Sequence, residues 1–466
     1  MKKFPLHALP AVLLLVSGCT TSAPKTALPV VQDQVATRTG LAVSWPLDED
    51  ERAKSEAAVR DLLAADLTVD SAVQIALLNN RSLRATFEEL GLAQAGLAAA
   101  ARLPNPRFDA SLRWPNTAPR GPNAEFGLSL PLLESLLLPA RKRVAQDQLL
   151  LTQYRVSHEV LALVAEVRGA AYAVLAEQEL KVRLAMIVRV NEAAADLARR
   201  QYEAGNIPQL ELAEIQASAQ ETQVELARTQ AKMGVAREQL NRLLGLTSAQ
   251  IGWKISGGLP ALPASEALPE NFEEMALEQR LDLSALRLLV ALAEKNWSLK
   301  SHTRLLPGEA DLGVSTERES AGERLTGPHL EIQLPLFDQG QPELARLAAE
   351  MRQARDRVAA LTADIGSEVR SARDSLIAAR QAAEYYQQTL LPQRRLILHE
   401  TLLQYNAMQK SVAALLAAKH QQQITERESV EALHDYWVAC VAFERALGHR
   451  LSTETISHPA VSPTDS

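Results

Sequence analysis

The sequence predicts a mainly α protein with a small β part, built from two copies of one structural unit. Three observations carry this prediction. Two segments about two hundred residues apart have closely similar sequences, two very long runs carry one apolar seam each, and four short segments alternate between apolar and polar residues. An apolar seam with helical spacing predicts helix and alternation predicts strand, so both kinds of element are expected.

The duplication extends over most of the chain. Phe-Gly-Leu-Ser-Leu-Pro-Leu-Leu at 126–133 corresponds to Leu-Glu-Ile-Gln-Leu-Pro-Leu-Phe at 330–337, and Tyr202 corresponds to Tyr405. A constant offset of 203 or 204 residues indicates duplication of a whole unit. We therefore expect a first repeat, a Gly- and Pro-rich linker, a second repeat and a polar tail, at residues 67–245, 246–270, 271–448 and 449–466.

The first residues have the pattern of a bacterial lipoprotein signal. Lys2 and Lys3 precede a short apolar run, and Leu-Val-Ser-Gly leads directly to Cys19, which resembles a lipobox. We expect residues 1–18 to be removed, Cys19 to carry palmitate-type lipid, and residues 19–66 to form a tether and equatorial segment. The alternatives are an ordinary signal or an anchor helix, although the apolar run is too short to span a bilayer.

Composition excludes several classes of function. The chain has 466 residues, 47% of them hydrophobic, and a net charge of -7, which becomes -9 when the two lysines leave with the signal. No basic excess indicates nucleic acid. After acylation of Cys19 only Cys440 is left, which excludes a disulfide within one chain. No other segment has the ~18 apolar residues of a membrane helix, so any membrane crossing is expected to use strands.

Four segments have the alternation of strands with one apolar and one polar face. They are expected at about 107–114, 125–130, 309–317 and 329–334. Closed membrane barrels begin at eight strands, so one chain is too small and two or three chains are needed. The lipid-facing side would then be Phe108, Leu112, Trp114, Phe126, Leu128, Leu312, Val314, Leu330 and Ile332. A soluble sheet packed on a core is the alternative.

A run of helix follows each strand pair. The runs are expected at about 141–203 and 343–405, and roughly 1.5 Å per residue makes each about 95 Å long. Apolar residues alternate at spacings of three and four, which predicts left-handed coiled-coil packing. The first run ends at Ala-Gly-Asn-Ile-Pro before Gln209, a sequence typical of a turn between two helices.

These features together resemble the TolC-type outer-membrane efflux family. The resemblance rests on the duplicated plan, on Gln-Leu-Pro-Leu-Phe-Asp-Gln-Gly at 333–340 and on Gln-Tyr-Glu-Ala-Gly at 201–205, and it covers about 68–448. Gln-Tyr-Asn-Ala-Met at 404–408 and Leu-Leu-Ala-Ala-Lys at 415–419 are similar to the branch associated with heavy-metal, particularly copper, efflux.

The resemblance implies a trimer with one twelve-stranded β-barrel and an α-barrel tunnel across the periplasm. It implies an exit duct in the outer membrane of a Gram-negative bacterium, which Thr20 after the cysteine also favours. The partners would be a periplasmic adaptor and a proton-driven inner-membrane pump. The adaptor-docking tips would be Tyr202, Ala204, Gly205, Asn206, Ile207, Pro208, Tyr405, Asn406, Ala407, Met408, Gln409 and Lys410.

The chain departs from the family at the second tip. Met408 stands where a glycine is usual, and Ala414 and Ala417 stand where acidic residues often form the entrance. We hypothesise that Glu211 and Glu214, with Lys410 as a basic neighbour, supply the entrance charge instead. The alternative is that these are solvated charges on helices.

The sequence contains no recognisable motif for catalysis, phosphate binding or metal chelation, so we expect no enzyme activity, cofactor or bound metal. Two other functions stay open. One is a periplasmic coiled-coil scaffold lipoprotein without a pore, and the other is a duct for type I protein secretion.

Overall fold

The structure is a computed structural model that describes residues 24–114, 116, 121–265, 268–306 and 310–451. The predicted lipidation site, Cys19, lies outside these residues. The chain divides into two compact units. Of the described residues, the first unit contains those in 24–31, 87–156 and 285–357, and the second contains those in 32–86, 157–284 and 358–451.

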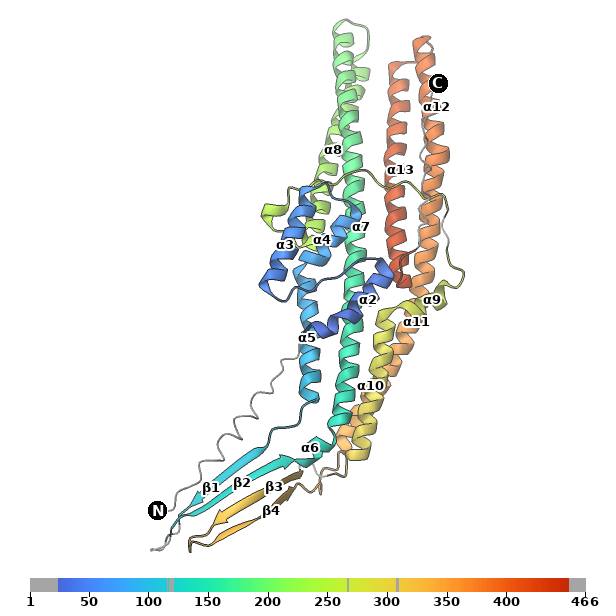
Figure 1. Cartoon of the computed structure of the whole chain (residues 1–466). Coiled ribbons are helices and arrows are strands. Elements are labelled where there is room, and N and C mark those ends of the chain that lie inside the picture. Colours follow the sequence, from blue (N-terminus) through green and yellow to red (C-terminus); the bar gives the residue numbers. More distant parts are fainter. Residues whose placement is uncertain (1–23, 115, 117–120, 266–267, 307–309, 452–466) are drawn as a thin grey trace, which may run out of the picture. The chain divides into compact units, whose positions relative to one another are not determined.

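The first unit contains one four-stranded antiparallel sheet in the order β1-β2-β3-β4 (Figure 1). Its strands are β1 (Arg107–Arg113), β2 (Asn123–Pro131), β3 (Ala310–Arg318) and β4 (Arg324–Ile332). The register places Phe108 opposite Leu128, Leu128 opposite Val314, and Leu312 opposite Leu330. Because directly paired residues share a face, the apolar sets of both repeats lie on the same side of the sheet.

The fourth strand differs from the expected range of 329–334, since it begins at Arg324 and ends at Ile332. Gly327 and Pro328 have the composition of a turn, but both belong to the strand, and Pro328 lies opposite Val314. A strand with one neighbour in the sheet tolerates a proline, which is the physical reason for the error. The turn lies earlier, where Gly322 has a positive φ of 96° and donates its N–H to the Glu319 carbonyl.

The first unit also contains parts of several helices, two of which share a small apolar cluster. They are parts of α5 (Arg81–Ala100), α7 (Leu138–Glu203), α10 (Leu281–Thr303) and α11 (Gln341–Tyr385), with the short α6 (Leu132–Leu136). Leu151 of α7 packs with Ala285 and Leu292 of α10. Ion pairs from Lys295 to Asp147 and from Arg355 to Glu294 flank this packing.

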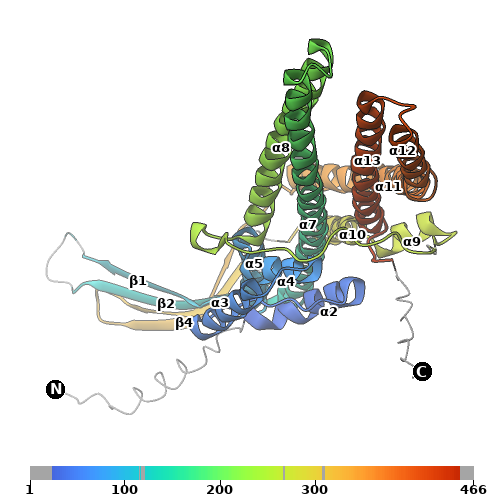
Figure 2. The ribbon, with the colours of Figure 1, turned by 90° about the horizontal axis from the view of Figure 1, so that it is seen from above.

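The second unit contains two antiparallel helix pairs. α7 lies beside α8 (Gln209–Leu244), and α12 (Leu391–Asn406) lies beside α13 (Val412–Leu447), as Figures 1 and 2 show. The shorter helices are most of α2 (Leu28–Thr39), α3 (Glu49–Ala64), α4 (Val69–Asn79) and α9 (Phe272–Gln279), with a 3-10 turn at Ser248–Gln250. A further 3-10 turn, Pro24–Ala27, belongs to the first unit. Thr68 caps α4 in a reciprocal capping box with Ser71.

The predicted apolar seams are buried in both long helices. Val160, Val167 and Val174 of α7 are fully buried, and so are Val369 and Leu376 of α11. Burial of one side chain per helical turn is what the three-and-four spacing predicts. The seam therefore identifies the face of each helix that packs against the rest of the protein.

The second long run is not one regular helix, which corrects the expectation for 343–405. Between α11 and α12 the segment Tyr386–Leu390 forms a wider π-helical turn, in which Leu391 donates its N–H to the Tyr386 carbonyl. Pro392 follows this turn. A proline has no N–H to donate, and its ring clashes with the carbonyl four residues earlier in a regular α-helix. The turn before Pro392 is therefore wider, and its hydrogen bond spans five residues instead of four.

Candidate functional site

The sheet exposes one almost entirely apolar face. Phe108 is 69% exposed and Trp114 is 72% exposed, and the rings of Phe108 and Phe126 stack with centroids 6.4 Å apart. The exposed members that the sequence predicts are Phe108, Leu112, Trp114, Phe126, Leu128, Leu312, Val314, Leu330 and Ile332. Leu130 lies on the same face but is missing from the predicted set, although its alternation with Leu128 marks it. A continuous exposed apolar face of this extent indicates an interaction surface.

The opposite face of the sheet is polar and internally paired. Arg107 binds Asp311 at 2.6 Å, and Arg113 binds Glu125 at 2.8 Å. The Asp109 carboxylate lies over Gly127, where an added Cβ would come within 2.3 Å of its oxygen. Glycine at position 127 therefore makes room for an acidic side chain on this face.

The two predicted tips are equivalent tight turns. After α7, Asn206 donates its N–H to the Gln201 carbonyl at 2.8 Å, and after α12, Gln409 donates to the Gln404 carbonyl at 2.9 Å. Each bond closes a helix end by the same six-residue pattern. The next helix starts at Gln209 after Pro208 in the first tip, and at Val412 after Ser411 in the second.

One residue of each tip adopts the left-handed backbone conformation. Gly205 has φ 75° in the first tip and Met408 has φ 56° in the second. A side chain in this region is strained, so Met408 occupies the position that glycine prefers. The Met408 side chain is also 94% exposed, which makes it the most projecting apolar group at the tips.

The predicted entrance residues lie close to these turns. Glu211 is in the first turn of α8 and is half-buried, whereas Glu214 and Lys410 are exposed. Ala414 donates its N–H to the Ser411 side chain at the start of α13. An acidic residue in the first turn of a helix is stabilised by the helix dipole, which gives Glu211 a structural role as well.

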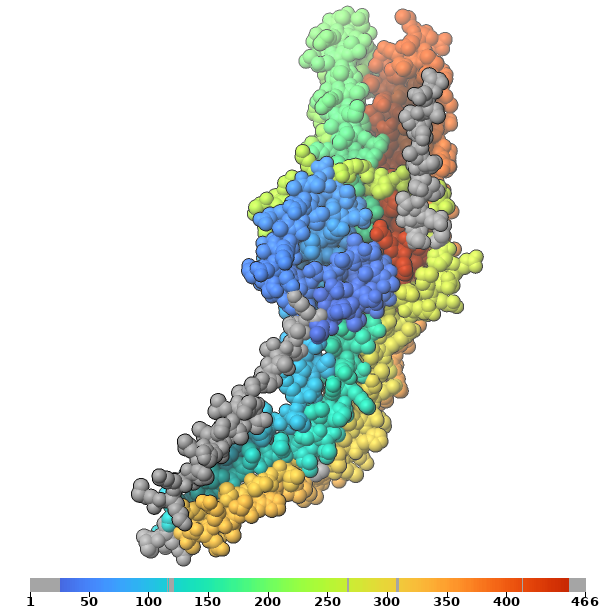
Figure 3. All heavy atoms as spheres, in the orientation of Figure 1, coloured from blue at the N-terminus to red at the C-terminus, as the bar shows by residue number. Residues whose placement is uncertain are grey.

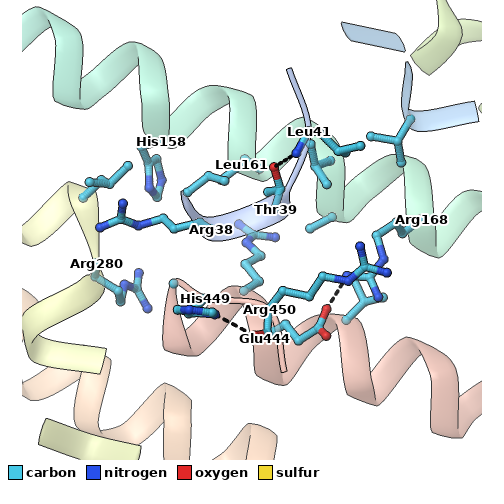
Figure 4. A pocket seen from close by; sticks show the side chains of 18 of the residues that line it. Arg38, Thr39, Leu41, His158, Leu161, Arg168, Arg280, Glu444, His449 and Arg450 are labelled. Carbon is cyan, nitrogen blue, oxygen red and sulfur yellow. Dashed lines mark hydrogen bonds and ion pairs between the residues drawn. The ribbon is translucent and has the colours of Figure 1, made fainter. Parts of the chain in front are cut away.

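A cavity of about 70 Å³ in the second unit is lined by several arginines (Figure 4). Arg38, Arg280 and Arg450 lie around it with His158 and His449, none of which the sequence analysis singles out. The Arg38 side chain donates a hydrogen bond to the Gln279 carbonyl at the end of α9. The backbone N–H of Arg450 donates to the Arg38 carbonyl at the end of α2.

Three helix ends meet at this cavity. The C-termini of α2, α9 and α13 meet there, and each has a partial negative charge that arginine stabilises. Arg168 forms a buried ion pair with Glu444 at its edge. Burial alone would lower the pKa of Arg168, but the Glu444 carboxylate raises that pKa above its ordinary value.

The described residues offer no arrangement for a bound metal. Over residues 24–451, gaps excepted, no three His, Cys, Asp or Glu side chains come together as ligands. Within the same part of the chain, no helix is both long and apolar enough to cross a membrane.

Comparison with known proteins finds one family match and one similar curated protein. Residues 72–246 match the family described as outer membrane efflux protein. The chain is 26% identical over 336 residues to the cobalt-zinc-cadmium resistance protein CzcC of Cupriavidus metallidurans, covering 71% of this chain and 77% of that protein.

Solved structures share the fold. The crystal structure of CusC superimposes with a TM-score of 0.69 at 18% identity, covering 83% of this chain and 93% of that chain. The CmeC outer membrane channel of Campylobacter jejuni gives 0.70 at 14% identity, covering 90% and 91%. The TolC-type resemblance is thereby confirmed. The chain thus resembles outer-membrane efflux proteins in sequence over residues 72–246, and it shares the fold of these solved channels over most of its length.

Proposed function

We propose that this protein is the outer-membrane exit duct of a tripartite efflux system that exports divalent heavy-metal cations. The observation that carries the proposal is the four-stranded sheet, whose exposed apolar face lies opposite a polar, acidic face. Three copies would supply twelve strands, enough to close a membrane barrel with the apolar face toward lipid and the polar face toward water.

The other parts of the chain fit the same role. Cys19 would anchor each copy to the membrane through its lipid, and the paired long helices would continue the duct through the periplasm. The turns at Gly205 and Met408 would receive the adaptor that connects the duct to a proton-driven pump. Asp109 and Glu331 would favour cations in the lumen through their field, whereas Glu125 and Asp311 are already paired with Arg113 and Arg107.

The metal cargo rests on the likeness to a cobalt-zinc-cadmium resistance protein. The deciding experiment is growth of a strain lacking this chain on graded cobalt, zinc, cadmium, copper and silver, beside dyes, bile salts and antibiotics. We expect hypersensitivity to cobalt, zinc and cadmium, and the copper and silver arms test the wider metal range. Sensitivity to organic compounds alone would overturn the metal cargo and leave a multidrug duct.

A second experiment separates a duct from a scaffold without a pore. A Cys19→Ala protein is expected to stay in the membrane fraction and to need detergent, because the exposed sheet face still requires lipid. A fully soluble Cys19→Ala protein would contradict the duct and favour the scaffold.

The entrance charge is tested on the purified pore in a planar bilayer. Replacing Glu211 by Gln is expected to lower cation selectivity, since a carboxylate at a narrow entrance attracts cations. Glu221→Gln, ten residues further along α8 and exposed, is the matched control. Unchanged selectivity and conductance in Glu211→Gln would remove the entrance role.

A further inference from the structure

Exposed apolar side chains gather where β4 leads into α11. Leu336 is 70% exposed and Phe337 is 99% exposed, although both follow directly on the sheet. Leu330, Ile332 and Leu334 precede them and are exposed too, so the apolar strip is continuous with the sheet face. The space-filling view shows β3 and β4 open on the drawn face (Figure 3). Apolar groups left in water at this density need an apolar partner.

Two cations lie against the loop that follows this apolar strip. Lys300 and Arg304, at the end of α10, lie against Gly340, whose added Cβ would be 3.0 Å from the Lys300 Cε and 3.5 Å from the Arg304 Cβ. Gly340 has φ 78°, which lets the loop turn tightly under both side chains. The nearby Glu343 forms an ion pair with Arg346 at 2.6 Å and also interacts electrostatically with Lys300. Among the described residues, neither Lys300 nor Arg304 has an acidic oxygen within ion-pair distance.

The first repeat has the same order of features. After β2, the short helix α6 leaves Leu136 68% exposed, and Arg141, Lys142 and Arg143 follow at the start of α7. Only Arg141 has an acidic partner among the described residues, Glu134 at 3.4 Å. Each hairpin is therefore followed, where the helix begins, by exposed apolar side chains and then by basic side chains.

We propose that this junction is a collar that binds anionic phospholipid in the periplasmic leaflet of the outer membrane. Leu336 and Phe337 insert at the edge of the acyl chains, and Lys300 and Arg304 bind the headgroup phosphates. Apolar side chains next to basic side chains match the membrane boundary, where acyl chains end and headgroup phosphates begin. The proposal rests on the proposed duct, because it requires the sheet to face lipid.

The lipid preference is tested on the full chain in two kinds of vesicle. One is phosphatidylcholine alone, and the other contains equal parts of phosphatidylcholine and phosphatidylglycerol. After gentle detergent extraction, mass spectrometry measures the phospholipids retained by the protein. We expect enrichment of phosphatidylglycerol, and we expect it to fall roughly thirtyfold in Lys300→Gln/Arg304→Gln, because each lysine or arginine near an anionic membrane surface contributes about 1 kcal/mol.

The matched control is Arg352→Gln/Arg357→Gln, which removes the same charge from exposed positions further along α11. This control is expected to retain the enrichment. Equal enrichment in all three proteins would overturn the proposal, and so would loss in the control alone. Displacement of phosphatidylglycerol by inorganic phosphate at constant ionic strength would assign the cations to a free anion and overturn the lipid site.

The depth of the apolar strip is measured with a fluorophore on Phe337→Cys. Lipids brominated along the acyl chain are expected to quench it. No quenching, with cross-linking of the label to a second copy, would make this face a protein interface and overturn the collar. If the protein enters both vesicles and conducts without preference for phosphatidylglycerol, the collar fails and the duct stands. If it enters neither, the proposed function fails.

Discussion

At the scale of single residues, the two tips place different residues, a glycine and a methionine, in the same left-handed backbone conformation. Gly205 takes the left-handed conformation without strain, whereas Met408 takes it with a side chain. The hydrogen bonds of the two turns are otherwise equivalent. Retention of a strained methionine that is almost fully exposed is consistent with a contact surface at this tip.

Replacement of Met408 by glycine is therefore expected to preserve the fold and to raise stability slightly. The left-handed conformation costs a side chain about 1–2 kcal/mol. Part of that gain is offset by about 0.5–1 kcal/mol of added freedom in the unfolded chain. The thermal midpoint in detergent checks this. The matched substitution Gly205→Ala is expected to lower the midpoint, and a lower midpoint for Met408→Gly would contradict the strain argument.

Disruption of the buried ion pair between Arg168 and Glu444 is expected to change stability more than the Met408 substitution does. Glu444→Gln is expected to destabilise the second unit by about 3–5 kcal/mol, because it leaves a buried guanidinium without its counter-charge. The double variant Arg168→Met/Glu444→Leu is expected to lie much closer to the native protein, since both charges are removed together. Denaturant unfolding followed by circular dichroism measures both. Equal losses in the two variants would show that packing, not charge, dominates.

At the scale of elements, an ion-pair clasp joins the start of α10 to α11. Arg280 binds Asp282 at 2.7 Å and also contacts Glu368. Burial opposes ionisation of Asp282, but the hydrogen bonds from Arg280 outweigh it and lower the pKa of that carboxyl below its ordinary value. The clasp therefore stabilises the fold when Asp282 is ionised.

The sign of this pH dependence follows from the lowered pKa. The contribution is complete above the unfolded value of about 4 and is lost as the pH falls through the lower folded value. Asp282→Asn is expected to be less stable than the native protein at pH 7, and the difference is expected to narrow below about pH 4. Thermal midpoints across this range measure it, with Asp356→Asn as an exposed control. A difference that is constant with pH would refute the clasp.

At the scale of the whole molecule, the two faces of the sheet determine how the chain meets its surroundings. Val314 and Ser315 are neighbours on β3 and point to opposite faces, the first to the apolar side. Val314→Lys is expected to impair membrane insertion, by roughly 2–4 kcal/mol if the site lies near the bilayer centre. Ser315→Lys is expected to insert normally. Membrane fractionation compares them, and equal insertion would contradict the assignment of faces.

The sequence predicts much of this fold because its signals are periodic and doubled. Strict alternation identifies the apolar face from Phe108 to Ile332, and the seam through Val160 and Val167 identifies the packed face of α7. The same signals fail where one local feature outweighs the pattern. Pro328 has the composition of a turn but belongs to an edge strand, and Pro392 is accommodated by a wider turn rather than by a helix end.

Taken alone, the amino-acid sequence determines the duplication, the types of element, the two faces of each strand and the turns at the tips. These depend on residue spacing and on the conformational freedom of glycine and proline, which are local properties. Only the tertiary structure decides that Arg280 and Arg38 meet at three helix ends, that Arg168 is buried against Glu444, and that Lys300 and Arg304 lie against Gly340. Such contacts join residues far apart along the chain, and no spacing within the sequence encodes the distance between them.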